Sequence, residues 1–349
     1  MAVDTLPNYI NGRWVEADCR GLLDVENPST GRTIARAPLS TGAELDRAVK
    51  AARAAFDGWR STPVGRRVAH LYELRGLLRE HSEEISRTLV EEMGKSLPDA
   101  RAELKRAFEN VEVACGMPVM QQGDKAVGAS YGIDGEVLRL PVGVFAMICP
   151  FNFPAMVPFW FLPYALATGN TFVLKPSEQA PCTFDLITKF IDRIDLPPGV
   201  FNVVHGDRAV GEAMLEHPGV DGMAFVGSTP VAKMISERCA QNGKRCVAMA
   251  GAKNHLVAMP DADVDQMIRN MVTSCFGCAG QRCMAASAIV AVGDEMYDTV
   301  CERFVAASRE VIVADPLDPE VADEPIAVSY THLRAHETSL HLVCRLLLE

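Results

Sequence analysis

The sequence predicts an α/β fold built on a parallel sheet, and two observations support this prediction. From residue 142 onward, short apolar runs alternate with amphipathic stretches, the order typical of parallel strands joined by crossover helices. The chain has 349 residues, 48% of them hydrophobic, so it can bury a core large enough for two lobes. We therefore expect two domains with a boundary near Ala250.

Helical stretches precede the expected sheet. Apolar side chains recur at helical spacing over residues 43–59 and 64–93, where Gly94 supplies a stop, and a third helix is expected around residues 101–115. The apolar stretch 151–167 contains three prolines and is short for a membrane span, so it indicates a buried helix and its approach. Strands of the first domain are expected at residues 142–149, 171–174, 200–204, 222–226 and 246–249.

A second alternating series follows, with a strand at 255–259, a helix at 264–280, a strand at 287–292 and a helix at 297–308. We expect residues 1–249 to form the first domain and residues 250–327 part of the second. Residues 328–349 differ from the rest, because they hold three histidines and a leucine cluster but no αβ period. They are expected to be a non-native tail from a frameshift, a cloning adapter or an assembly error; a natural divergent terminus is the alternative.

Charge and cysteine content restrict the class of protein. A formal net charge of -11 without a basic patch argues against a nucleic-acid or membrane surface. Eleven cysteines spread through a long chain, with no signal peptide before the first expected strand, are typical of reduced thiols in the cytoplasm. We expect a cytoplasmic protein whose partners are small molecules.

Cys283 is the candidate nucleophile. It follows a glycine-rich break at the end of an expected helix, and the charge of Arg282 would favour the thiolate that attacks a carbonyl carbon. One more half-buried cysteine is the alternative. Cys275, Cys278 and Cys283 also suggest zinc, but no further Cys or His pair with ligand spacing follows, so no metal is expected.

Three other segments place polar groups at strand ends. Asn152 lies in a turn between two prolines, from which its amide can donate to an oxyanion; a simple turn residue is the alternative. Gly227 and Ser228 precede Pro230, expected at the first position of a helix whose start can hold a pyrophosphate; an ordinary capped turn is the alternative. Lys175 and Glu178 suit ribose hydroxyls, or form a solvated surface pair.

These segments, in this order, resemble the aldehyde dehydrogenase superfamily over residues 9–327. The motifs are F-N-F-P, K-P-S-E, F-V-G-S, G-A-K-N-H and F-G-x-A-G-Q-R-C. The combination of P-F-N-F-P, G-A-K-N-H and G-Q-R-C-M resembles the CoA-acylating, methylmalonate-semialdehyde branch. The resemblance implies a Rossmann-type NAD-binding domain with an oligomerisation hairpin around residues 120–140, and an α/β catalytic domain that is incomplete here, because members of the family are much longer.

The resemblance also implies roles for individual residues. Cys283 would be the nucleophile and Asn152 the oxyanion donor, while Arg106 and Arg282 would hold a substrate carboxylate; for Arg106 a surface helix charge is the alternative. The NAD site would comprise Cys149, Phe151, Lys175, Glu178, Gln179, Gly227, Ser228 and Ala250.

Met249 stands where hydrolytic members of the superfamily carry a glutamate that activates water. A thioether cannot act as a general base, so coenzyme A is the expected acyl acceptor. The implied reaction converts methylmalonate or malonate semialdehyde into propanoyl-CoA or acetyl-CoA with loss of carbon dioxide, in valine or inositol breakdown, by a homotetramer or homodimer. A hydrolytic dehydrogenase and an inactive NAD-binding fragment are the alternatives.

Overall fold

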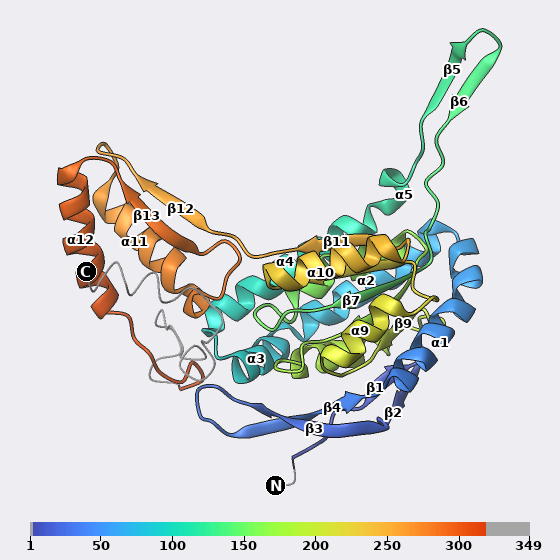
Figure 1. The fold of residues 1–349 in the computed structure, drawn as a ribbon, viewed down its shortest axis with the longest axis horizontal. Helices are drawn as coiled ribbons and strands as arrows, with labels where there is room; N and C mark the ends of the chain where they lie inside the picture. The colour runs from blue at the N-terminus through green and yellow to red at the C-terminus, as the bar shows by residue number, and fades with distance from the viewer. Residues whose placement is uncertain (1–2, 319–349) are drawn as a thin grey trace. The chain divides into compact units, whose positions relative to one another are not determined.

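The computed structural model describes residues 3–318, so the tail expected at residues 328–349 lies outside the described part of the chain (Figure 1). The chain divides into two compact units. Unit 1 comprises Met1–Val25, Ile34–Ile85 and Glu103–Ala250, and unit 2 comprises Glu26–Thr33, Ser86–Ala102 and Gly251–Glu349. Unit 2 thus includes two segments that the sequence placed with the first domain.

A seven-stranded sheet forms the centre of unit 1, in the order β11-β10-β7-β8-β9-β1-β2. The five strands from β11 to β9 run parallel, while β1 and β2 complete one edge in antiparallel pairing. The predicted α/β fold with a parallel sheet is confirmed. The strands are β1 (Asn8–Ile10), β2 (Arg13–Val15), β7 (Val144–Ile148), β8 (Thr171–Lys175), β9 (Phe201–Val203), β10 (Gly222–Val226) and β11 (Arg245–Met249).

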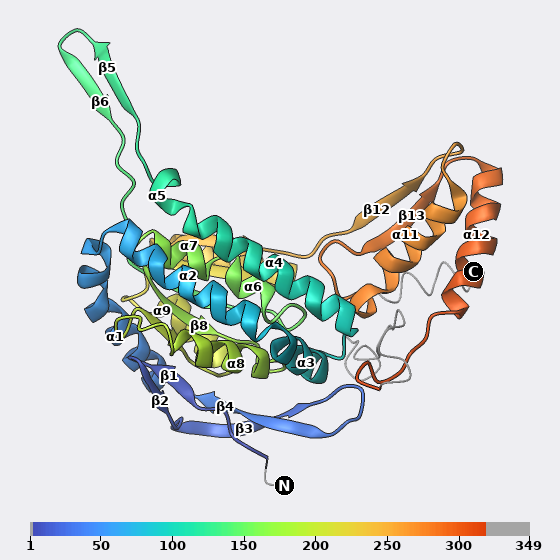
Figure 2. The ribbon, with the colours of Figure 1, turned by 180° about the vertical axis from the view of Figure 1, so that it is seen from behind.

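Helices cover both faces of this sheet. On the face seen in Figure 1 lie α1 (Gly42–Ser61), α9 (Arg208–Glu216) and α10 (Thr229–Gln241). Figure 2 shows the opposite face, covered by α2 (Val64–Glu80), α4 (Leu97–Cys115), α6 (Met156–Phe159), α7 (Leu162–Ala167) and α8 (Cys182–Ile191). All five residues of β8 are buried, as expected for a central strand covered on both faces.

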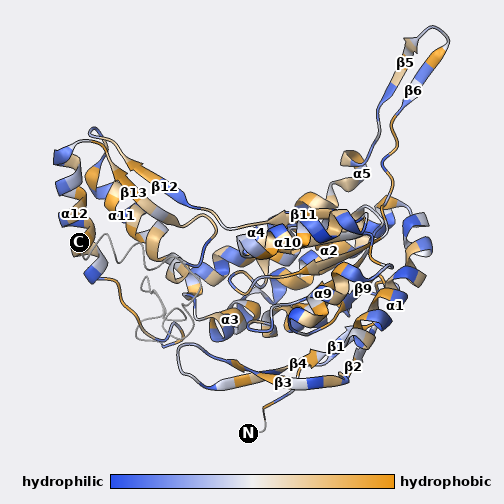
Figure 3. Cartoon of the chain, in the orientation of Figure 1, coloured by the Kyte–Doolittle hydropathy of each residue, from blue (hydrophilic) through white to orange (hydrophobic). Residues whose placement is uncertain are grey.

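Besides the strand pair of unit 2, two pairs of strands in the described residues lie outside the central sheet. One comprises β3 (Cys19–Glu26) and β4 (Thr33–Ser40). The other is an antiparallel hairpin of β5 (Lys125–Ser130) and β6 (Ile133–Glu136), which follows the short helix α5 (Met117–Met120). Hydrophobic residues lie at the start of β6 and in the segment after it (Figure 3), where Ile133, Leu138 and Leu140 are exposed.

Unit 2 has its own small core. The parallel strands β12 (Asn254–Ala258) and β13 (Ala286–Ala291) pack against α11 (Val264–Phe276) and α12 (Asp294–Arg309). Buried Met271 and Phe304 lie in this core. Within residues 3–318, no helix combines the length and the apolar character needed to cross a bilayer.

Several expected boundaries are wrong. The stretch 64–93 is interrupted at His81, whose ring stacks on Phe190, and continues as a separate helix α3 (Ser82–Met93). The helix expected to reach residue 280 ends at Phe276, because Cys278 and Ala279 adopt left-handed backbone angles in a short 3₁₀ helix, η1 (Gly277–Gly280). Pro230 occupies the second rather than the first position of α10.

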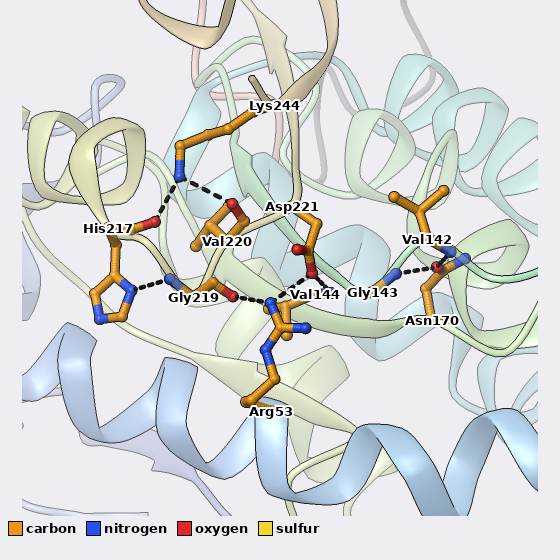
Figure 4. Close-up of polar contacts among 10 residues, drawn as sticks. All are labelled: Arg53, Val142, Gly143, Val144, Asn170, His217, Gly219, Val220, Asp221 and Lys244. Carbon is orange, nitrogen blue, oxygen red and sulfur yellow. Dashed lines mark hydrogen bonds and ion pairs between the residues drawn. The ribbon is translucent and has the colours of Figure 1, made fainter. Parts of the chain in front are cut away.

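Polar contacts tie together the amino ends of the parallel strands (Figure 4). Asp221 Oδ2 accepts hydrogen bonds from the Val144 amide at 2.7 Å and from the Arg53 guanidinium at 2.6 Å. Lys244 Nζ donates to the Val220 carbonyl at 2.9 Å. Gly143 has φ of +148° and a Cβ there would lie 1.8 Å from Asp221 Oδ2, so only glycine fits this position.

Candidate active site

Apart from Arg106 on α4, the candidate residues of unit 1 lie at or just after the carboxyl ends of the parallel strands. Cys149 and the turn that carries Asn152 follow β7, Lys175 ends β8, and Gly227 and Ser228 follow β10. The chain proceeds from β7 outward to β8 and β9, then returns to the other side of β7 for β10 and β11. Ligands of open α/β sheets bind where the strand order reverses in this way, here between β7 and β10.

The turn carrying Asn152 is fixed from α4. Asn152 is partly buried, and the backbone amides of Ala155 and Met156 each donate to Glu103 Oε1 at 3.0 Å. The Glu103 side chain is buried. A buried carboxylate that accepts two amide hydrogen bonds is a strong anchor, so the turn after β7 has a defined conformation.

Lys175 is not the solvated surface charge that the sequence left open. Its side chain is buried, and Nζ donates to Glu178 Oε2 at 2.9 Å and to the carbonyls of Pro176 and Gly206 at 3.0 and 2.7 Å. All three ammonium protons therefore have acceptors. Glu178 is partly exposed and presents its carboxylate beside this cation.

Ser228 is the N-cap of α10 and is exposed, but its hydroxyl makes no capping hydrogen bond within the helix. The first amides of a helix carry a partial positive charge and have no intrahelical acceptors. Together with an uncommitted serine hydroxyl, this helix start can accept a phosphate group.

The remaining candidates of unit 1 differ in exposure. Cys149 is buried, and burial raises the pKa of its thiol far above the usual range even though the Lys175 ammonium lowers it, so this thiol stays protonated. Phe151 and Gln179 are partly buried, whereas Ala250 is exposed. A protonated, buried thiol can line a site but is a poor nucleophile.

Cys283 belongs to unit 2 and is exposed. It lies in the segment between η1 and β13. In η1, just before this segment, Cys278 and Ala279 both have φ of +53°, in the left-handed region that is unfavourable for residues with a Cβ. Asn254 at the start of β12 donates to the Cys283 carbonyl at 2.7 Å. The loop thus presents an exposed thiol on a held backbone.

The two arginines predicted to hold a substrate carboxylate have different surroundings. Arg282, in unit 2, makes an ion pair with Asp99 at 2.6 Å and lies across Gly277, where a Cβ would come within 2.5 Å of the guanidinium. Arg106, in unit 1, is exposed on α4. Among residues 3–318, therefore, Arg282 has a carboxylate partner and Arg106 has none.

The sequence did not point to four residues that lie beside the candidate residues or contact them or their segments: Glu103 and His205 in unit 1, and Asp99 and Asn254 in unit 2. His205 is buried just after β9, and the position of its strand end was a usable signal. Asn254 lies within the G-A-K-N-H motif, whereas Glu103 and Asp99 gave no local signal. Among residues 3–318, no three Cys, His, Asp or Glu side chains form a group that could hold a metal ion.

Comparison with known proteins adds a family to this geometry. The model of the "Aldehyde dehydrogenase family" matches residues 14–337. Malonate-semialdehyde dehydrogenase 1 of Geobacillus kaustophilus is 44% identical over 321 residues, which cover 92% of this chain and 65% of that protein. The chain therefore spans slightly less than two thirds of this curated relative.

Solved structures agree with the sequence comparison. A Sinorhizobium meliloti protein complexed with NAD, provisionally assigned as a methylmalonate-semialdehyde dehydrogenase, has a TM-score of 0.89 and 35% identity, covering 94% of this chain and 66% of that one. Methylmalonate-semialdehyde dehydrogenase of Oceanimonas doudoroffii has a TM-score of 0.88 and 40% identity, covering 91% and 65%.

Proposed function

Because the chain belongs to the aldehyde dehydrogenase family, we propose that the protein oxidises malonate semialdehyde or methylmalonate semialdehyde with NAD and transfers the acyl group to coenzyme A. Two residues carry this proposal. Cys283 is exposed on a held loop, and Met249, where a hydrolytic enzyme needs a base, is a thioether. In this proposal residues 1–249 bind NAD and residues 250–327 belong to the catalytic domain.

The carboxyl ends of the unit 1 strands fit a dinucleotide. Glu178 provides a carboxylate for the hydroxyls of the adenosine ribose, and Lys175 beside it would exchange one of its present acceptors for a hydroxyl oxygen. Ser228 with the start of α10 provides donors for the pyrophosphate. Gly227, Cys149, Phe151, Gln179 and Ala250 complete the surroundings. When bound there, NAD supplies the hydride acceptor of the reaction.

Cys283 and Asn152 perform the first chemical step in this proposal. The Cys283 thiolate adds to the aldehyde carbon, and the electron pair of the carbonyl bond moves to its oxygen. The Asn152 amide donates to that oxygen and stabilises its developing negative charge. After oxidation, the acyl group remains on Cys283 as a thioester.

Release of the acyl group then depends on its acceptor. Met249 is 42% exposed and its sulfur cannot deprotonate water, so hydrolysis of the thioester lacks a base at this position. The thiolate of coenzyme A needs no such base; it attacks the thioester carbonyl and releases the Cys283 thiolate. Loss of the substrate carboxylate as carbon dioxide yields acetyl-CoA from malonate semialdehyde or propanoyl-CoA from its methyl homologue.

Recognition of a carboxylated aldehyde is the proposed role of Arg106 and Arg282. A guanidinium matches a carboxylate in charge and in fork geometry. For Arg282 the substrate would exchange with Asp99, its partner in this structure. The preference for a carboxylated over a neutral aldehyde should therefore depend on these two arginines.

The test measures NADH formation from malonate semialdehyde with and without coenzyme A. We expect turnover only with coenzyme A, and Cys283→Ala should lower it by about a thousandfold or more, because the covalent intermediate cannot form. Cys301→Ala is the matched control, since Cys301 is also exposed in unit 2 but lies on α12. Equal turnover without coenzyme A would contradict acyl transfer and indicate hydrolysis.

A further inference from the structure

The backbone of the loop that carries Cys283 does not follow from local preferences alone. Cys278, Ala279 and Gly280 have φ of +53°, +53° and +73°, so three successive residues are left-handed and two of them have a Cβ. Such a run persists only where surrounding contacts determine it. Some group outside the loop must therefore hold its conformation.

Asn254 makes two contacts with the backbone that follows this run. Its Nδ2 donates to the Cys283 carbonyl at 2.7 Å and to the Ala285 carbonyl at 3.1 Å. A primary amide has two N–H donors, and both are used on carbonyls at and just beyond the candidate nucleophile. The contact acts on the backbone of Cys283 itself.

The pairing of the two strands in unit 2 explains how this side chain reaches the loop. Asn254 pairs with Ala286, but His255 pairs with Ala288, so the register shifts by one residue at the beginning of β13. A bulge of this type redirects the chain locally and is common beside active sites. Here it lies directly after the loop that ends at Ala285.

Arg282 holds the same loop through a side chain rather than through the backbone. Its guanidinium pairs with Asp99 at 2.6 Å and donates to the Thr273 carbonyl at 3.5 Å. These contacts restrain the residue before Cys283, whereas the Asn254 amide restrains Cys283 and the turn into β13. The two restraints act on different atoms.

We propose that Asn254 is a positioning residue that sets the place of the Cys283 thiol by holding the carbonyls of Cys283 and Ala285. The inference rests on the proposed role of Cys283 as the nucleophile. Without the Asn254 amide, water can hydrogen-bond to the two exposed carbonyls, so the free energy of unfolding changes little. The Cys283 thiol, however, is no longer held in one orientation. A displacement of about 1 Å from the attacking geometry lowers a rate by about a hundredfold.

The test compares Asn254→Asp with Asn270→Asp. The first variant keeps the shape of the side chain but cannot donate at neutral pH, and it sets a carboxylate against two carbonyl oxygens. Asn270 is exposed on α11 in the same unit, so the second variant is a control for the added charge. Asn254→Ala removes the donors without adding charge and should behave like Asn254→Asp.

Two measurements are made on each variant of the full chain. We expect amide hydrogen exchange of residues 281–286 to accelerate about tenfold in both Asn254 variants while exchange in α11 is unchanged. In NADH formation we expect kcat to fall at least tenfold, with the KM for NAD within about twofold of the wild type, since the NAD residues lie in unit 1. Asn270→Asp should leave both measurements unchanged.

The possible results separate the inference from the proposed function. The inference is overturned if amide exchange of the loop is the same in the Asn254 variants as in Asn270→Asp. It is also overturned if exchange is faster throughout residues 251–318, because Asn254 would then stabilise unit 2 as a whole. Faster loop exchange with unchanged kcat would also overturn it. If the wild type forms no NADH, the proposed function fails, while hydrogen exchange still decides whether Asn254 holds the loop.

Discussion

Lys175 and His205 are buried ionisable residues at the carboxyl ends of two neighbouring strands. Lys175 ends β8, and His205 follows β9, the neighbouring strand. His205 is buried, its amide donates to Asn8 Oδ1 at 2.8 Å, and its Nε2 has no hydrogen-bond partner among residues 3–318. A protonated imidazole would therefore stand next to the Lys175 ammonium without a counter-charge.

The pH dependence of stability should report this arrangement. Burial, together with the charge of Lys175, lowers the pKa of His205 to about 4. In the unfolded chain His205 binds a proton as the pH falls below about 6.5, whereas in the folded protein it does so only near pH 4. The free energy of unfolding therefore decreases as the pH falls from about 6.5 to about 4, by up to about 3 kcal/mol. Above that range the histidine is neutral in both states.

Urea unfolding of the wild type and His205→Gln, at about pH 7 and about pH 4.5, measures this effect. We expect the unfolding midpoint of the wild type to fall more steeply with acidification than that of the variant. Asp185 is a further contributor with the opposite sign, because burial raises its pKa, but it is present in both proteins and cancels in the comparison. Equal slopes would show that His205 does not titrate in this way.

At the scale of elements, α4 controls the turn after β7 through Glu103. Replacing Glu103 with Ala leaves two buried amides, those of Ala155 and Met156, without their acceptor, and should cost about 2–3 kcal/mol of stability. Glu103→Gln keeps an oxygen at the same place and should cost less than about 1 kcal/mol. Chemical denaturation gives the stabilities.

The same pair of variants tests the link from α4 to catalysis. Because the anchored turn carries Asn152, Glu103→Ala should also lower the kcat of NADH formation by about tenfold or more, and Glu103→Gln should restore most of it. Equal losses for both variants would indicate that the negative charge, rather than the anchoring oxygen, matters.

These elements also show what the sequence could predict. Hydrophobic periodicity predicted the parallel strands and α1 correctly, and it placed Lys175, Ser228 and the Asn152 turn at strand ends. The structure shows that these strand ends lie at one side of the sheet. The break after Phe276 could not be predicted, since Cys278 and Ala279 adopt left-handed angles that tertiary contacts impose. Strands β1 to β4 were not expected.

The contacts that support the candidate residues could not be predicted from the sequence, for a physical reason. Glu103 and Ala155 are separated by 52 residues, and Asp99 and Arg282 by 183. No local periodicity encodes such pairs, because they depend on how distant elements pack. The motifs could therefore be recognised in the sequence, whereas the contacts that support them required the structure.

At the scale of the whole molecule, the hairpin of β5 and β6 and the segment after it expose several large apolar side chains of unit 1. Tyr131 at its tip is fully exposed, and Val127, Leu138 and Leu140 are each more than two thirds exposed. Apolar surface of this kind favours association with a second copy of the chain. This fits the oligomerisation role that we propose for residues 120–140 in a homodimer or homotetramer.

Sedimentation velocity tests the hairpin. We expect the wild type to sediment as an oligomer and Ile133→Asp combined with Leu138→Asp to shift it toward the monomer, because charged side chains cannot be buried without partners. Tyr72→Asp, an exposed aromatic on α2, is the control and should leave the mass unchanged. A double variant that sediments like the wild type would exclude the hairpin as the interface.

The Asp221 contacts at the amino ends of the strands have a practical consequence for engineering. They fasten the sheet at the amino ends of its parallel strands, whereas the proposed NAD residues lie at the carboxyl ends, so substitutions that strengthen these contacts need not alter the NAD residues. A library of substitutions around Arg53, Asp221 and Lys244 can thus be screened for higher thermal stability while the proposed NAD residues stay unchanged.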